Sequence, residues 1–348
     1  MPSLISRGTV SARGFGFGTI PVNPIVGPPY IAVAHANSPY ISTYPFNAGF
    51  GTKYANPATL PTGNGLGVAF NPAGTAIALA HANSPYISTY PWSSGFGTKY
   101  ANPATLPGGG GRGVAFNPAG TVIAVAHNTS PNLATYPWSA GFGTKYANPA
   151  TLPPANGNNV AFNPAGTAIA LAHANSPYIS TYPWSAGFGT KYANPATLPT
   201  GNGTGVAFNP AGTAIAVAYT ISPFIYTYPW SAGFGTKYAN PATLPGGVGW
   251  GVAFNPAGTA IALAHWSSPN LATYPWSAGF GTKYANPATL PTGDGYGVAF
   301  NPAGTAIALA HWSSPYISTY PWSAGFGTKY ANPATLPTGN GLGVAFTN

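Results

Sequence analysis

The stretch "GVAFNPAGTAIALAHANSPYISTYPWSSGFGTKYANPATLP" (67–107) holds one complete copy of a unit that builds nearly the whole chain. Its first motif, GVAF, recurs at a constant step of 46 residues, with NVAF as a single variant at 159–162. These motifs end at Phe70, Phe116, Phe162, Phe208, Phe254, Phe300 and Phe346. The motif GFGTKYANPATLP occurs seven times, starting at Gly49, Gly95, Gly141, Gly187, Gly233, Gly279 and Gly325. A repeat of this length is typical of a β-propeller with one blade per repeat.

The repeat predicts four strands in each blade. Residues 67–70 are rich in β-formers and stop at Asn-Pro-Ala-Gly, a turn sequence. Residues 75–81 alternate in side-chain size with the period of a strand, and 86–92 are β-branched and aromatic. Residues 98–106 form a poorer fourth strand, whose proline an outer edge tolerates. Helix is excluded by the spacing of Pro and Gly.

The chain therefore predicts an all-β, seven-bladed β-propeller of 46-residue repeats. Blade 1 lacks a GVAF motif of its own, whereas a spare copy ends the chain. We expect the C-terminal strand at 343–347 to complete blade 1 and close the ring without leaving a free sheet edge. The segment IPVNP (20–24) is the competing candidate for that strand. The expected organisation is an N-terminal arm at 1–24 and a propeller at 25–348.

The composition excludes several kinds of active site. The 348 residues include ten Lys and Arg, a single acidic residue, Asp294, and no Cys. Carboxylate-pair hydrolysis, carboxylate-bound Ca²⁺ and Ser-His-Asp catalysis need acids that this chain lacks, and thiolate chemistry needs Cys. We therefore expect no enzyme and no cofactor. No run approaches the roughly 18 apolar residues of a membrane span, and no signal peptide is visible, so we expect no membrane insertion.

The repeat resembles a known family. The segment GVAFNPAGTAIALAH (67–81) is similar to WD40-like propellers, in which VAFSPDG is common. The longer segment KYANPATLPTGNGLGVAFNPAGTAIALAHANSPYIS (53–88) resembles the "LANPATLP…GVAFSPDGTYLAVAH…SPYITIY" repeats of WD40-like proteins encoded by bacteriophages, often among virion and tail genes. The resemblance covers residues 25–348. Ala73 replaces the Asp of SPDG and Tyr90-Pro91 replaces Trp-Asp, so we expect aromatic packing in place of the WD40 hydrogen-bond network.

Two places vary while the rest of the repeat is copied. The first precedes the glycine of GVAF, in the expected loop between blades, and holds Leu66, Arg112, Asn158, Thr204, Trp250, Tyr296 and Leu342. The second follows the residue that ends the second strand, and holds Ala36, Ala82, Asn128, Ala174, Thr220, Trp266 and Trp312. Because the first two strands are antiparallel neighbours, both places lie on one face of the disc. Loops on a rigid scaffold commonly carry binding residues.

Large aromatic residues gather at these places in blades 6 and 7. Trp and Tyr are favoured at binding sites because they offer a large apolar face with a polar edge. We predict a ligand-binding face made by Trp250, Trp266, Tyr296, Trp312, Asp294, Arg112, Asn128 and Asn158. Neutral drift at tolerant loop positions is the alternative.

Histidine and lysine also recur once per blade. The histidines that end the second strand are His35, His81, His127, His173, His265 and His311, with Tyr219 in blade 5. One per blade places them too far apart to share a metal ion, so we expect structural histidines bonded to a neighbouring loop and no metal site. The lysines predict a positive outer rim and are Lys53, Lys99, Lys145, Lys191, Lys237, Lys283 and Lys329. They protect edge strands or dock to an acidic surface. They do not form the basic stripe typical of nucleic-acid binding.

These features favour a non-enzymatic bacteriophage virion protein, in a tail fibre or on the capsid surface. Its varied face would bind a host surface glycan or a partner protein. The arm, with Arg7 and Arg13, and the lysine rim would contact other virion proteins. The alternatives are a free multivalent propeller lectin and a passive capsid decoration protein without a ligand.

Overall fold

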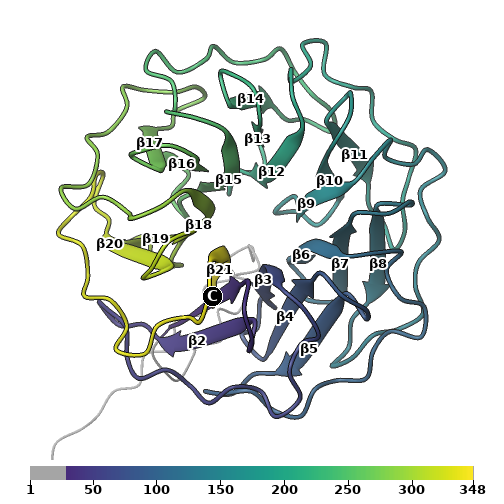
Figure 1. The fold of residues 1–348 in the computed structure, drawn as a ribbon. Coiled ribbons are helices and arrows are strands. Elements are labelled where there is room, and N and C mark those ends of the chain that lie inside the picture. The colour runs from purple at the N-terminus through teal and green to yellow at the C-terminus, as the bar shows by residue number, and fades with distance from the viewer. Residues whose placement is uncertain (1–28, 348) are drawn as a thin grey trace, which may run out of the picture.

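The computed structural model describes residues 29–347, in which 21 strands form seven three-stranded antiparallel sheets. The sheets stand as blades around a common axis (Figure 1). This confirms the predicted all-β, seven-bladed propeller. Residues 29–347 contain no helix, and hence none long and apolar enough to cross a membrane.

Each blade has an inner, a middle and an outer strand. From blade 1 to blade 7 the inner strands are β21 (Gly341–Phe346), β3 (Gly65–Phe70), β6 (Gly111–Phe116), β9 (Gly157–Phe162), β12 (Gly203–Phe208), β15 (Gly249–Phe254) and β18 (Gly295–Phe300). The middle strands are β1 (Tyr30–His35), β4 (Ala76–His81), β7 (Val122–His127), β10 (Ala168–His173), β13 (Ala214–Tyr219), β16 (Ala260–His265) and β19 (Ala306–His311). The outer strands are β2 (Ile41–Pro45), β5 (Ile87–Pro91), β8 (Leu133–Pro137), β11 (Ile179–Pro183), β14 (Ile225–Pro229), β17 (Leu271–Pro275) and β20 (Ile317–Pro321).

The C-terminal strand closes the ring, as predicted. β21 pairs antiparallel with β1, with Ile31 opposite Phe346 and Val33 opposite Val344. The backbone N–H of Thr347 donates to the Tyr30 carbonyl at 3.0 Å, which extends the ladder by one bond. Figure 1 shows the chain end inserted between β18 and β3 at the axis. The competing segment 20–24 and the expected arm at 1–24 lie outside the described residues.

The predicted fourth strand does not form. Residues 98–106 contain no strand. The segment is held to the blades by separate bonds: the Tyr100 N–H donates to the Thr89 carbonyl at 2.9 Å, and the Tyr136 hydroxyl of the next blade donates to the Thr105 carbonyl at 2.9 Å. The proline in this segment has no N–H to donate, so a continuous ladder is interrupted. The outer edge of each blade is therefore covered by a tethered segment.

The hydrophobic core lies between blades. In β4, Ala76 and Ala78 pack against blade 3, whereas Ile77 and Leu79 point the other way and pack against blade 1. Both faces of the middle strand are thus buried. One face carries small side chains and the other carries large ones. The alternation of small and large residues in the repeat follows from this need to fit each blade against the next.

The turn between inner and middle strands explains the constant motif Asn-Pro-Ala-Gly. The Asn71 Oδ1 accepts the backbone N–H groups of Thr75 and Ala76, both at 2.8 Å. The Asn71 amide also donates to the Thr75 hydroxyl at 3.0 Å. Gly74 has a φ of 66°, which favours glycine. Asn71 and Gly74 thus have a bonding and a conformational role, which accounts for their repetition.

Candidate functional site: the axial pocket

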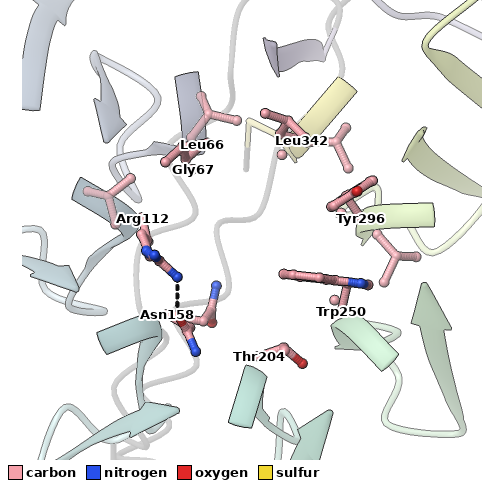
Figure 2. A pocket seen from close by; sticks show the side chains of 18 of the residues that line it. Leu66, Gly67, Arg112, Asn158, Thr204, Trp250, Tyr296 and Leu342 are labelled. Carbon is pink, nitrogen blue, oxygen red and sulfur yellow. Dashed lines mark hydrogen bonds between the residues drawn. The ribbon is translucent and has the colours of Figure 1, made fainter. Parts of the chain in front are cut away.

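The starts of the inner strands surround a pocket of about 560 Å³ on the axis (Figure 2). All seven residues of the first varied place line it: Leu66, Arg112, Asn158, Thr204, Trp250, Tyr296 and Leu342. The sequence placed these residues in a loop between blades, and that was wrong. Each is the second residue of an inner strand.

A β-bulge in each blade explains this position. In blade 2, Gly65 pairs with His81 and Gly67 pairs with Ala80, so the pairing skips Leu66. The same shift occurs in the other blades. A bulge leaves its extra residue out of the ladder and redirects its side chain. The bulged residue is therefore free to vary without breaking a strand pair, and the seven bulges surround one pocket.

One side of the pocket is polar. The Arg112 Nη1 donates to the Asn158 Oδ1 at 2.7 Å, and the Asn158 Nδ2 donates to the Gly203 carbonyl at 2.7 Å. The Thr204 hydroxyl donates to the Gly249 carbonyl, also at 2.7 Å. Each of these three side chains thus bonds to the blade after its own. The bond to Asn158, which is itself anchored to blade 5, holds the Arg112 side chain in place.

The charge of Arg112 is not neutralised by the protein around it. Burial lowers the pKa of the Arg112 guanidinium, because a low-dielectric site disfavours charge. The chain has one acidic side chain, Asp294, which does not line the pocket. Arg112 therefore presents a half-buried positive charge to the cavity.

The opposite side of the pocket is aromatic. The ring centroids of Trp250 and Tyr296 lie 5.1 Å apart, and those of Tyr296 and Trp312 lie 5.7 Å apart. Trp266 packs behind them, with its centroid 5.4 Å from that of Trp250. Figure 2 shows Trp250 and Tyr296 across the pocket from Arg112. The cavity is therefore divided into a cationic polar wall and an aromatic wall.

The structure brings most of the predicted site residues together. Those lining the pocket are Arg112, Asn128, Asn158, Trp250, Tyr296 and Trp312. Two lie outside the lining: Trp266, which is 37% exposed, and Asp294, whose Oδ1 accepts the Ser267 N–H at 3.1 Å. Ligand binding by these residues stays a prediction.

The sequence prediction missed Asn159, which also lines the pocket. It occupies the place of the GVAF glycine, where most blades need glycine. A Cβ on Gly113, for example, would come 2.8 Å from the Asn159 Cα of the next blade. The single change from GVAF to NVAF was the signal that could have revealed it. Asn158 and Asn159 together place two amide groups at the pocket.

The histidines are structural. His81 is fully buried, and its Nε2 lies 3.0 Å from the Ser88 Oγ of the outer strand. The predicted bond to a loop is present in blades 4 and 6, where the Nδ1 of His173 and of His265 lies 2.8 Å from the carbonyl of the next residue; the serine partner was not predicted. Burial lowers the pKa of His81 to about 4. Within residues 29–347 no group of His and Asp side chains could hold a metal ion.

The lysines lie outside any strand and are partly buried. Lys99 donates to the Asn102 Oδ1 of its own segment, and burial lowers its pKa. In blade 5, Lys237 also lies 4.3 Å from the centroid of the Tyr226 ring. The predicted docking of this rim to an acidic partner stays a prediction.

The fold is similar to that of three bacterial propellers. A candidate 6-phosphogluconolactonase of Bacteroides fragilis is 12% identical with a TM-score of 0.72, over 93% of this chain and 99% of that one. Another from Bacteroides uniformis is 16% identical with a TM-score of 0.68, over 92% and 99%. The periplasmic gluconolactonase of Pseudomonas aeruginosa is 15% identical with a TM-score of 0.68, over 92% and 99%. No protein-family model and no curated protein matches the chain.

These comparisons correct the functional expectations from the sequence. We expected a bacteriophage virion protein that is not an enzyme, with lectin and decoration roles as alternatives. The similar propellers are instead bacterial proteins, named as lactonases, that share the fold along nearly their whole length. The repeat motifs specify blade packing and turns, which proteins of different function share, so they were a poor guide to role. At these identities the likeness establishes the fold alone.

Proposed function

We propose that the axial pocket binds a small organic anion that carries a sugar ring. Arg112 would bind the anionic group, and Trp250 with Tyr296 would contact the ring. The observation that carries this proposal is the half-buried arginine, without an acidic partner, facing an aromatic wall across one cavity. The resemblance of the repeats to WD40-like proteins contributes only the scaffold to this proposal.

The cationic wall suits a phosphate or carboxylate group. Arg112 uses its Nη1 for Asn158, and its other N–H groups donate to no protein acceptor in residues 29–347. A guanidinium has five N–H donors, arranged to bind an oxyanion through two parallel hydrogen bonds. Because the bond to Asn158 already orients the side chain, little conformational entropy remains to be lost on binding.

The aromatic wall suits a ring with an apolar face. Trp250 and Tyr296 are half-buried, so part of their surface is open to the cavity. The amides of Asn128 and Asn158 line the same cavity and can bond to hydroxyl groups. A phosphorylated sugar lactone, the substrate class in the names of two similar propellers, combines the two features that these walls recognise.

Lactone hydrolysis is the second candidate function, favoured by the names of the similar propellers. Water would add to the lactone carbonyl, the ring C–O bond would break, and a hydroxy acid would result. Arg112 could stabilise the negative charge that develops on the carbonyl oxygen. The lining contains no carboxylate or imidazole to act as a general base, and for this reason binding is the primary proposal.

Isothermal titration calorimetry with 6-phosphogluconate, gluconate, glucose 6-phosphate and glucose tests the proposal. The matched variant is Arg112→Leu, because leucine occupies the same place at Leu66 and Leu342. A hydrogen bond to a charged group contributes about 1.5–3 kcal/mol, so the variant should bind the phosphorylated ligands roughly 10- to 100-fold more weakly. Its affinity for glucose should not change.

Two results would overturn the proposal: no binding of any anionic sugar at millimolar concentration, or equal binding by Arg112→Leu. A parallel pH-stat assay with 6-phosphogluconolactone and gluconolactone tests hydrolysis. Hydrolysis is supported if the protein releases acid faster than the spontaneous rate and if Arg112→Leu reduces this release. Release at the spontaneous rate leaves binding as the sole function of the pocket.

A further inference from the structure

The only acidic residue of the chain lies beside the two most exposed tryptophans. The Asp294 carbonyl accepts the Trp312 N–H at 2.9 Å, and its Oδ1 accepts the N–H of Ser267, the residue after Trp266. Asp294 therefore joins the loops that carry both tryptophans. At the equivalent places the other blades have no charge: Asn64, Gly110, Asn156, Asn202, Val248 and Asn340.

The negative charge of Asp294 is not needed for this loop contact. Two repeats earlier in the chain, the Asn202 Oδ1 accepts the N–H of Asn175 at 3.3 Å, in the same arrangement. Asn175 and Ser267 share a positive φ, 62° and 70°, so the two loops also have the same backbone form. A neutral amide can thus accept the same loop N–H, and the charge requires another explanation.

The surrounding aromatic surface is open to solvent. Trp266 is 37% exposed and Trp312 is 49% exposed, whereas three other blades have alanine at this place. Tyr296 lies between them, with ring centroids 6.3 Å from Trp266 and 5.7 Å from Trp312. Burial raises the pKa of Tyr296, and the nearby Asp294 charge adds to this effect. The carboxylate therefore acts on the ring at the centre of the cluster.

We propose that Asp294, Trp266, Tyr296 and Trp312 form a rim site for a quaternary or methylated ammonium cation. The faces of aromatic rings carry negative potential and attract such cations, which are weakly hydrated. A nearby carboxylate adds a charge contact, and in residues 29–347 no lysine or arginine donates to Asp294. The rim site shares Tyr296 and Trp312 with the aromatic wall of the pocket, but it does not use Arg112.

Choline, tetramethylammonium and 3,3-dimethylbutan-1-ol, the uncharged analogue of choline, test this site by tryptophan fluorescence and calorimetry. The chain itself supplies the variants: Asp294→Asn copies four other blades, and Trp312→Ala copies Ala36, Ala82 and Ala174. We expect both cations to bind, the uncharged analogue to bind at least about tenfold more weakly, and each variant to weaken choline binding by about tenfold. Arg112→Leu should bind choline as the unchanged protein does.

Three results would overturn the rim site: no binding of either cation, equal binding of the uncharged analogue, or choline binding unaffected by Asp294→Asn. Circular dichroism spectra confirm that each variant is folded. The two proposals can fail separately: if the unchanged protein binds choline but no anionic sugar, only the proposed function is overturned.

Discussion

The two faces of the disc are built from the same repeats, yet one is constant and the other varies. On the constant face, Asn71 makes three hydrogen bonds within its turn. On the pocket face, Leu66 sits at a bulge outside the strand pairing, and the neighbouring loop is held by a backbone bond from Ala82 to Asn64. Side chains are thus constrained where they satisfy backbone groups and can change where the backbone satisfies itself.

Acid should destabilise the pocket face more than the constant face, because the fully buried histidines lie at the pocket end of the middle strands. His35, His81, His127 and His311 have pKa values lowered by burial from 6.5 to about 4. The unfolded chain therefore binds more protons between these values, and stability should fall as the pH drops from 6.5 to 4. At about 1.4 kcal/mol per pKa unit, this is the largest effect expected here.

Urea unfolding at pH 7, 6, 5 and 4.5 measures this loss. With Asp294 as the only acidic side chain, the acid-side titration reports almost entirely on histidine. A flat profile from pH 7 to 4.5 would show that the histidines are not buried in their neutral form.

A substitution on the constant face should lower the free energy of unfolding more than a substitution at a bulge. Asn71→Ala leaves the N–H groups of Thr75 and Ala76 without their acceptor, which should cost about 2–3 kcal/mol. Leu66→Thr, which copies Thr204 at another bulge, should stay within about 0.5 kcal/mol. Urea unfolding of both variants at pH 7 gives the two values. Equal losses would remove the proposed reason for the difference between faces.

A smaller loss of stability is expected when the serine that is hydrogen-bonded to the buried histidine is replaced. Ser88→Ala removes the partner of the His81 Nε2 and should cost about 1 kcal/mol. Blade 3 already has Ala134 in that place, and both ring nitrogens of His127 lack a partner within the described structure. Ala134→Ser should therefore stabilise by about 1 kcal/mol. Thermal unfolding measures both, and a loss in each variant would contradict the pairing.

The smallest effect on stability is expected for Asp294→Asn. Asn202 makes the equivalent loop contact without charge, so the free energy of unfolding should change by less than about 0.5 kcal/mol. Urea unfolding at pH 7 checks this. A loss above about 1 kcal/mol would mean that the charge supports the loop, which would weaken the argument for the rim site.

Sequence reasoning predicted the parts of the fold that repeat. The 46-residue step predicted the blades, and the spare GVAF copy predicted the pairing of β21 with β1. The prediction of a fourth strand at 98–106 was wrong, because a proline in the sequence is compatible both with an edge strand and with a segment tethered by separate bonds. Six of the eight predicted binding residues line the pocket, but the prediction missed Asn159, which varies at a place taken to be structural.

By itself, the sequence determined the number of blades, the closing strand and the places free to vary, because near-identical copies separate constant from changing residues. Only the tertiary structure decided what the varied residues form together. The bulges turn them toward the axis, and Arg112 and Trp250, 138 residues apart in the chain (250 − 112), come to face each other across one pocket (Figure 2). Closing the ring sets this arrangement, since the position of each wall depends on all seven blades.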